Sequence, residues 1–166
     1  MDRDELRRVQ GPLKERYRAE PAAAVITLRA EGVLSETEVS CSVQTGRALV
    51  EAGLHPATGG DGRLSCSGDM LLQALVGCAG VTLRSVATNR GMEVSGTVRA
   101  EGDLDFQGTL GTDRSAPVGF RSIRLMFDLE SDASAEDLEA LVATTERYCV
   151  VFQTLAHSPD LTIVSG

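Results

Sequence analysis

Two cysteines, far apart in the chain and each beside an apolar segment, are the residues best suited to chemistry. Cys78 lies in Leu-Val-Gly-Cys-Ala-Gly, and Cys149 lies in Glu-Arg-Tyr-Cys-Val-Val. A cysteine reacts as its thiolate, so a reactive thiol needs a pKa below about 8.5 and an opening for substrate. If the two segments pack together, one thiol can attack a substrate and the other can resolve the product as a disulfide. Taken alone, each cysteine is better explained as a small core residue.

Two glycines flank the first of these cysteines inside what we expect to be a long helix. Each of Gly77 and Gly80 costs the helix roughly 0.5–1 kcal/mol relative to alanine. Their presence predicts that another segment approaches the helix closely at this point.

Other residues are weaker candidates for chemistry. Cys66, just before the expected helix, is a rival nucleophile because the start of a helix favours a thiolate, although a partly exposed loop thiol is the simpler interpretation. Cys41 alternates with polar neighbours and is expected in a core. Because His55 and His157 have no paired-ligand spacing with the cysteines, we predict no zinc site. We also predict no other metal and no cofactor. The glycine-rich stretch 59–62 lacks the lysine and Ser/Thr of a phosphate-binding loop and is typical of a turn.

Size and charge argue against several classes of function. The chain has 166 residues, which suits one domain with a substantial core, and a formal net charge of −8. An acidic protein is not attracted to nucleic acid or to an anionic membrane surface, and aromatic residues are too few for base stacking. The charged start leads into no apolar h-region, so we expect no signal peptide, and no apolar run approaches the ~20 residues needed to span a bilayer. We therefore expect a cytoplasmic protein whose thiols stay reduced.

The first part of the chain predicts a helical arm followed by short strands. Residues 4–20 are charged and helix-prone, and Gly11-Pro12 is expected to break this helix before Pro21 closes it. Residues 25–30 and 38–43 have the composition and the alternation of strands.

A long helix is predicted in the middle of the chain. Turn-forming residues over 53–68 predict a loop, and a loop before a helix often contributes to a site. The helix itself is expected over 69–89, with Ser67 capping its start and Gly91 its end. Its apolar residues recur at i, i+3 and i+4, so they share one face: Leu71, Leu72, Leu75, Cys78, Ala79, Thr82, Leu83 and Val86.

The second half of the chain predicts strands on either side of a further helix. Alternation over 94–100 and 123–129 indicates two strands joined by a glycine-rich connection, and 161–164 is expected to form a last strand. Ser134 opens a capping-box-like sequence, which predicts a helix ending near Tyr148. The apolar run that follows, up to Leu155, is too short to assign by periodicity. Together these elements predict an α+β domain with a sheet packed on helices.

Two segments of the chain resemble the OsmC/Ohr family, osmotically inducible protein C and organic hydroperoxide resistance protein. One is Gly68-Asp-Met-Leu-Leu-Gln-Ala-Leu-Val-Gly-Cys78, followed by Ala-Gly-Val-Thr-Leu, and the other is Arg147-Tyr-Cys-Val-Val-Phe-Gln-Thr-Leu155. The resemblance implies an OsmC-like domain over 23–166, preceded by an N-terminal helical arm over 1–22. It also implies a curved antiparallel sheet wrapped around a long central helix, in an intertwined homodimer.

The same resemblance implies a thiol-dependent peroxidase that acts in oxidative stress defence. Cys78 would attack an organic hydroperoxide or hydrogen peroxide and become a sulfenic acid, and Cys149 would resolve it as a disulfide. A dithiol reductant of the lipoyl type would then restore both thiols. Asp69 stands where related sequences place a glutamate early in the helix.

The family also implies an arginine that lowers the pKa of the attacking thiol and holds the peroxide. Arg29, Arg47 and Arg63 are the candidates for this substrate-binding role, since each precedes the long helix. The loop at 53–61 and the N-terminal arm depart from the best-known peroxidases of the family.

Two other functions fit the same residues. One is a non-enzymatic OsmC-like protein that binds a small apolar ligand at its dimer interface, with thiols that are redox-sensitive or merely packed. The other is a sensor whose Cys78–Cys149 disulfide switches a partner.

Overall fold

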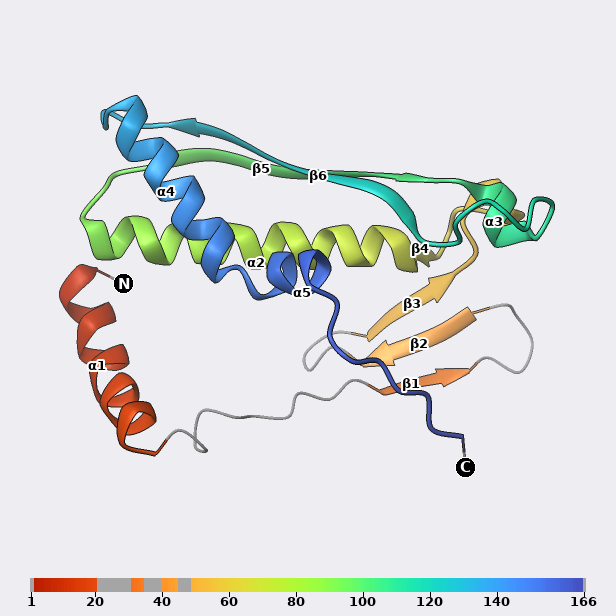
Figure 1. Ribbon diagram of the computed structural model, residues 1–166, viewed down its shortest axis with the longest axis horizontal. Helices are drawn as coiled ribbons and strands as arrows, with labels where there is room; N and C mark the ends of the chain where they lie inside the picture. Colours follow the sequence, from red (N-terminus) through yellow and green to blue (C-terminus); the bar gives the residue numbers. More distant parts are fainter. Residues whose placement is uncertain (1, 21–30, 35–39, 45–48, 166) are drawn as a thin grey trace. The chain divides into compact units, whose positions relative to one another are not determined.

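The computed structural model describes residues 2–20, 31–34, 40–44 and 49–165. The chain divides into two compact units, each built from separate stretches of sequence. The first unit comprises Met1–Gly11, Ala74–Ala100 and Leu125–Gly166, and the second comprises Pro12–Gln73 and Glu101–Arg124. Figure 1 shows the elements in chain order, from red at the N-terminus to blue at the C-terminus.

The longest element is helix α2, Ser67–Arg90, which has 24 residues. Its most deeply buried side chains are spaced by four residues and therefore form one stripe: Leu75, Ala79, Leu83 and Ala87. This finding confirms the predicted helix and the centre of its apolar face, whereas Leu71 is exposed.

Helix α2 ends at Arg90, and Gly91 caps this end as the sequence predicts. This glycine has a φ of +70°, a conformation that other residues rarely adopt. Its N–H donates to the carbonyl of Thr88 (3.1 Å), and the N–H of Met92 donates to the carbonyl of Ala87 (2.9 Å). These two bonds form a Schellman motif, which satisfies carbonyls that the helix end would otherwise leave unpaired.

By length and composition alone, α2 would be able to cross a membrane, because a window of it has a mean hydropathy of 1.5. The expectation that no segment approaches this length overlooked α2. The core helix of a globular domain meets the same length and hydropathy criterion.

The core of the first unit lies where α2 meets helix α4, Ala135–Tyr148 (Figure 1). Leu83 and Ala87 from α2 pack with Leu141 from α4. Half-buried apolar side chains surround these three: Val86, Met92, Val94, Phe127, Leu129 and Leu138. Truncating a fully buried leucine such as Leu141 to alanine typically costs about 2–5 kcal/mol.

Helix α4 begins where the capping-box-like sequence predicts. Ser134 has extended backbone, and its Oγ accepts a hydrogen bond from the N–H of Asp137 (3.1 Å). The helix ends at Tyr148, and the apolar run that periodicity could not assign forms a short helix α5, Val150–Ala156.

Strands β5, Ser95–Leu104, and β6, Phe120–Glu130, pair as a two-stranded ribbon. Cross-strand ion pairs of Arg99 with Asp128 and of Arg124 with Asp103 show that the strands are antiparallel. Both predicted strands are therefore confirmed. A Cβ on Gly96 would collide with the carbonyl of Asp128, so only glycine permits this approach. The glycine-rich connection contains helix α3, Phe106–Leu110.

The second unit contains a four-stranded sheet in the order β1-β2-β3-β4. Its strands are β1 Glu31–Leu34, β2 Ser40–Gln44, β3 Leu49–Gly53 and β4 Ser65–Cys66. The first three are antiparallel, but β3 and β4 are parallel, with Ala52 opposite Ser65. Strand β2 agrees with part of the strand predicted over 38–43. The strand predicted over 25–30 and the predicted burial of the Cys41 side chain lie outside the described residues.

The predicted loop over 53–68 contains more structure than expected. It holds β4 and a short 3-10 helix, Pro56–Thr58, which His55 caps by accepting a hydrogen bond at Nδ1 from the N–H of Ala57 (3.0 Å). Cys66 is consequently the last residue of a strand and is half-buried, not a loop residue.

Two predictions of local structure are wrong. Helix α1, Arg3–Ala19, continues through Pro12. A proline inside a helix removes one hydrogen bond, but the strong helix formers around Pro12 compensate for this loss. The strand predicted over 161–164 does not form: Leu161, Ile163 and Val164 are each at least 85% exposed. Alternation gives a strand only where a neighbour supplies hydrogen bonds, and no described strand pairs with this segment.

Candidate active site

The two cysteines that the sequence singles out lie side by side in the first unit. Cys78 comes from α2 and Cys149 from the junction of α4 and α5, and the two thiols are close enough for each to shift the pKa of the other. Both are free thiols. The structure therefore brings together two residues that are 71 positions apart (149 − 78) in the sequence.

The junction between α4 and α5 explains how Cys149 reaches this position. Cys149 has extended backbone (φ −74°, ψ 105°) and separates the two helices by itself. Its N–H donates to the carbonyl of Thr145 (2.8 Å), and its carbonyl accepts from the N–H of Gln153 (2.9 Å). The Gln153 side chain also donates to the carbonyl of Glu146 (2.9 Å). These bonds fix the turn between the helices.

The start of α5 supplies hydrogen-bond donors to Cys78. Burial would raise the pKa of the Cys78 thiol, but the N–H groups of Val151 and Val150, the thiol of Cys149 and the hydroxyl of Thr82 lower it. The net result is a pKa below the usual value for cysteine. The first N–H groups of a helix have no partner within it and carry its positive end, so they are suited to stabilising a thiolate.

The second thiol has the opposite character. Burial raises the pKa of Cys149, and the neighbouring sulfur of Cys78 raises it further. Cys149 is 0% exposed, whereas Cys78 is only partly buried. The pair thus combines one partly accessible thiol whose pKa is lowered with one enclosed thiol whose pKa is raised.

Sequence reasoning missed two features of this site. Thr82 was counted only as part of the apolar face of the helix, although its spacing of four residues from Cys78 places it one turn away on the same side. The donors at Val150 and Val151 are main-chain groups, and they depend on a helix start that the short apolar run did not reveal.

The structure does not bring the other predicted site residues into the first unit's thiol pair. Arg63 and Asp69 belong to the second unit. Arg63 forms an exposed ion pair with Asp61 (3.4 Å), and Asp69 lies in the first turn of α2, where a carboxylate suits the helix dipole. Arg29 and Arg47 lie outside the described residues. The catalytic and substrate-binding roles given to these four residues stay predictions.

Cys66, the rival nucleophile, lines a separate cavity of about 330 Å³ in the second unit. The rings of His55 and Phe106 stack there, with their centroids 5.0 Å apart, and Phe120 and Asp69 also line the cavity. In the part of the chain that the structure describes, no cluster of His, Cys, Asp and Glu side chains is placed to hold a metal ion.

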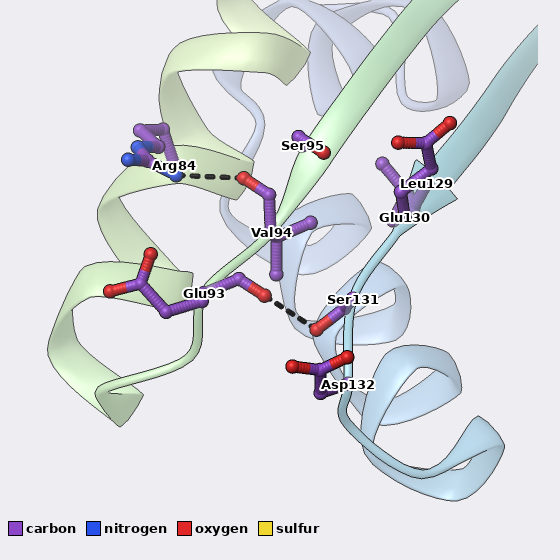
Figure 2. A pocket seen from close by; sticks show the side chains of 8 residues that line it. All are labelled: Arg84, Glu93, Val94, Ser95, Leu129, Glu130, Ser131 and Asp132. Carbon is purple, nitrogen blue, oxygen red and sulfur yellow. Dashed lines mark hydrogen bonds between the residues drawn. The ribbon is translucent and has the colours of Figure 1, made fainter.

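A wider groove of about 740 Å³ lies on the first unit and is mainly polar (Figure 2). Arg84 donates to the carbonyl of Val94 (2.8 Å), and Ser131 donates to the carbonyl of Glu93. These bonds tie the end of α2 and the end of β6 to the start of β5. The groove contains no thiol, and its hydrogen bonds have a structural role because they connect secondary-structure elements.

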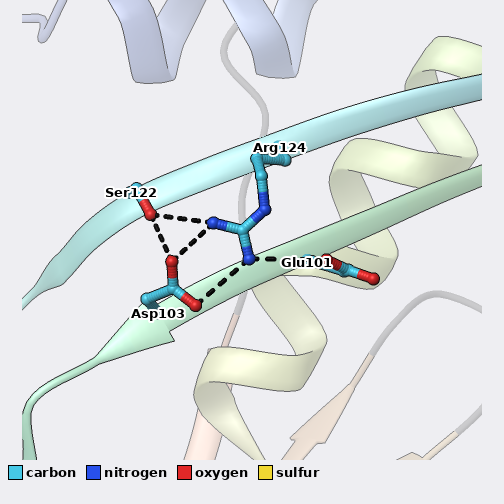
Figure 3. A network of polar contacts seen from close by, with 4 residues as sticks. All are labelled: Glu101, Asp103, Ser122 and Arg124. Carbon is cyan, nitrogen blue, oxygen red and sulfur yellow. Dashed lines mark hydrogen bonds and ion pairs between the residues drawn. The ribbon is translucent and has the colours of Figure 1, made fainter.

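On the second unit's part of the ribbon, Arg124 lies among three polar side chains (Figure 3). It donates to the carboxylate of Asp103 (3.1 Å from Nη2) and to that of Glu101 (3.4 Å), and Ser122 also donates to Asp103. The hydrogen bonds from Arg124 and then from Ser122 hold the pKa of Asp103 far below its usual range. All four groups are exposed and satisfy one another.

The fold is α+β, and its distinguishing site is a pair of neighbouring thiols whose pKa values are shifted in opposite directions. The sequence model of the OsmC-like protein family matches residues 60–164, which is more than half of the chain. The chain therefore belongs to the OsmC-like family. A search of curated protein sequences finds no match.

Solved structures agree with this assignment at the level of the fold. An OsmC-like protein from Mycoplasma pneumoniae superposes with a TM-score of 0.66 at 17% identity, covering 80% of this chain and 89% of that one. An organic hydroperoxide resistance protein from Elizabethkingia anophelis gives 0.64 at 12% identity, with 81% and 91% covered. The organic hydroperoxide resistance protein OhrB of Bacillus subtilis gives 0.54 at 16% identity, with 81% and 94% covered.

Proposed function

We propose that this protein is a thiol-dependent peroxidase that reduces organic hydroperoxides or hydrogen peroxide in oxidative stress defence. The observation that carries the proposal is the contact between Cys78 and Cys149, whose pKa values are shifted in opposite directions. Similarity in fold to organic hydroperoxide resistance proteins supports the same activity.

In the first step, the Cys78 thiolate attacks one oxygen of the peroxide. The S–O bond forms as the O–O bond breaks, and the leaving oxygen takes up a proton to give an alcohol, or water from hydrogen peroxide. Cys78 is then a sulfenic acid. The donors that lower the pKa of Cys78 keep its sulfur in the nucleophilic form before the attack.

In the second step, Cys149 resolves the sulfenic acid. Its thiol gives up a proton, its sulfur attacks the sulfur of Cys78, and the hydroxyl leaves as water while the disulfide forms. A dithiol of the lipoyl type would then reduce the disulfide by exchange and would itself become a disulfide. Such a reductant suits a cytoplasmic location, which we propose for this protein. No cofactor is needed for this sequence of steps.

The peroxide-holding arginine belongs to the same proposal. Arg29, Arg47 and Arg63 are the candidates, with Asp69 as the carboxylate that would orient the guanidinium. Single substitutions to glutamine would identify the residue, since the correct one would raise the KM for peroxide while the others would not.

Peroxide turnover in a defined system tests the proposed activity. With cumene hydroperoxide as substrate and dihydrolipoamide as reductant, the wild type should consume peroxide and the Cys78→Ser variant should not. Cys66→Ser serves as the control, because Cys66 lies in a different unit from the thiol pair. Circular dichroism would verify that both variants fold. Equal turnover by the wild type and Cys78→Ser would overturn the assignment of Cys78.

We also propose that the protein is an intertwined homodimer that uses the exposed side of α2. Within the first unit, no other segment comes within 4 Å of where a Cβ on Gly77 or Gly80 would lie, and neighbouring Val81 is 74% exposed. The close approach that these glycines predict is therefore not made within this unit, and a second copy would supply it.

The oligomeric state can be measured by size-exclusion chromatography with light scattering. Gly77→Leu should shift the protein from dimer to monomer, because the added side chain blocks the approach while leucine favours the helix. Gly119→Leu is the matched control, since its Cβ position is also open. A dimer unaffected by Gly77→Leu would contradict this interface.

The alternative function, binding of a small apolar ligand at the dimer interface without catalysis, has one observation in its favour. An apolar groove of about 430 Å³ lies between β6 and α4 in the first unit, lined by Phe127, Leu129, Leu138 and Val142 among others. Native mass spectrometry of the purified protein should find a retained ligand if this function is correct. Peroxide turnover without any retained ligand would reject it.

A further inference from the structure

The cavity in the second unit has no part in the proposed chemistry of the thiol pair. Its volume is about 330 Å³. Its lining comes from the loop before β4, the start of α2, the end of β5 and the segment from α3 to the start of β6. Sites for small molecules begin at about this size, and they combine aromatic or apolar walls with a few polar groups.

Three aromatic rings line the cavity. The rings of His55 and Phe106 are stacked, with their centroids 5.0 Å apart and their planes inclined by 19°. The ring of Phe120 packs directly on the main chain of Gly102, so closely that a Cβ on this glycine would collide with it. All three rings are half-buried, so each is still partly accessible to a small molecule.

Local contacts hold these rings in position. His55 accepts a main-chain hydrogen bond at Nδ1 (3.0 Å). Asp105, the residue before Phe106, caps α3 and also forms an ion pair with Arg121 (3.5 Å), the residue after Phe120. Because walls that are already ordered lose little freedom when a ligand binds, such a cavity is suited to binding.

The surroundings of Gly68 show that the cavity is also apolar at the start of α2. A Cβ on this glycine would lie 3.4 Å from the ring of Phe120, 3.5 Å from the side chain of Leu104 and 3.6 Å from the sulfur of Cys66. These are ordinary van der Waals distances. An aromatic ring, an aliphatic side chain and a thiol therefore surround this point, and none of them carries a charge that a ligand ring would have to desolvate.

One carboxylate determines which charge the cavity favours. Asp69 lines the cavity and is exposed, whereas the rings are half-buried. Asp103 also lines it, but the carboxylate of Asp103 already bonds to Arg124. Among the residues that the structure describes, no cation pairs with Asp69. An ammonium group would be attracted by this carboxylate and by the faces of the rings, and an anion would be repelled.

We propose that this cavity binds a small planar aromatic amine. The aromatic ring of the ligand lies against the half-buried rings, and its ammonium group pairs with Asp69 on the exposed side. The site goes beyond the proposed peroxidase, because it belongs to a different unit from the thiol pair and involves no reaction. An arginine held by Asp69 would compete with the amine for the same carboxylate.

The test uses three probes that share an indole ring and differ in charge. Tryptamine is a cation, indole is neutral and indole-3-acetate is an anion. Because the chain contains no tryptophan, the fluorescence anisotropy of each probe reports its binding without an indole background from the protein. Tryptamine should bind saturably with a Kd of about 1 mM or below, as expected for a ligand of this size. Indole should bind more weakly and indole-3-acetate most weakly. Equal affinities, or no saturation by tryptamine, would overturn the proposal.

Substitutions locate the binding site. Phe106→Leu keeps an apolar side chain but removes the ring, so tryptamine binding should weaken about threefold to tenfold. Asp69→Asn should weaken tryptamine binding about two- to fivefold and leave indole binding unchanged, since only the charge is lost. Circular dichroism would verify that the variants fold.

Phe127→Leu is the matched control, because it removes a half-buried ring from the apolar groove of the first unit. This variant should bind tryptamine as the wild type does. If it weakened binding as much as Phe106→Leu, the probe would occupy that groove and the proposal would fail.

Alkylation by iodoacetamide gives a second readout that needs no variant. Cys66 lines the cavity, and Cys78 belongs to the other unit. Both lie in one tryptic peptide, between Arg63 and Arg84, in which fragmentation distinguishes them. Tryptamine should slow the alkylation of Cys66 and not that of Cys78. Unchanged alkylation of Cys66, or protection of Cys78, would contradict binding in this cavity.

Discussion

Two regions of the molecule carry shifted pKa values, yet they differ in kind. On the ribbon of β5 and β6, Asp103 and Arg124 are opposite charges that form an ion pair exposed to solvent. At the thiol pair, Cys78 is stabilised by neutral donors and remains partly accessible, while its partner is enclosed. A perturbed pKa marks a candidate site only when it leaves a reactive group that is not already paired. The comparison therefore makes the thiol pair, and not the ribbon, the candidate site.

Apart from the loss of turnover expected for Cys78→Ser, the largest effect should come from removing the buried thiol. Cys149→Ser should still allow Cys78 to react with peroxide but should lower repeated turnover by at least about tenfold, because a hydroxyl cannot resolve a sulfenic acid as a disulfide. Labelling with dimedone, which traps sulfenic acids, would find the intermediate at Cys78 in this variant and not in the wild type. Undiminished turnover in Cys149→Ser would show that another thiol performs the resolving step.

A second prediction concerns the separation of the two thiols along the pH scale. Site-resolved alkylation should give Cys78 an inflection below about 8.5, the value of a free thiol, and Cys149 an inflection above it. The order follows from the donors around the first sulfur and the burial of the second. Identical inflections would mean that the two thiols do not differ in pKa. The contrast between the thiol pair and the ribbon would then be lost.

These shifts also determine how each thiol contributes to stability. Because its folded pKa is lowered, Cys78 stabilises the fold above its unfolded pKa, and this contribution is lost as the pH falls through the folded value. Because its folded pKa is raised, Cys149 contributes below its unfolded pKa, and that contribution is lost as the pH rises through the folded value. Urea denaturation of the single serine variants across pH 6–10 would measure both trends.

The smallest effect should come from the ribbon. Asp103→Asn should lower the urea midpoint slightly at pH 7, and the difference should shrink in 1 M salt, since the ion pair is exposed and screened. The folded pKa of Asp103 is lowered, so its contribution is present above the unfolded value of about 3.9 and is lost as the pH falls further. Peroxide turnover should not change. A loss of turnover in this variant would give the ribbon a role in catalysis.

Much of the fold can be predicted from patterns that are local in sequence. Helix α2 shows its buried stripe and its glycine end, α4 shows its Ser134 cap, and the alternation of β5 and β6 gives both strands. Features that depend on a distant partner cannot be predicted in this way. Alternation over 161–164 indicated a strand, but a strand also needs a neighbour, which residue patterns do not specify.

In the candidate site, too, the sequence reveals local features but not those that depend on distant groups. Cys78 and Cys149 were identified from their apolar surroundings and from two segments that resemble a known family. The groups that lower the pKa of Cys78 were not identified from the sequence, because two of them are main-chain amides at the start of a seven-residue helix. The third, Thr82, occupies a position in the apolar stripe that packing alone would explain.

The most direct test of the thiol pair as a redox centre is disulfide mapping by mass spectrometry, after about one equivalent of cumene hydroperoxide is added to the fully reduced protein. We expect rapid loss of two free thiols per chain and a single new disulfide that joins Cys78 to Cys149. Unchanged thiols, or a disulfide that involves Cys66 instead, would contradict the account.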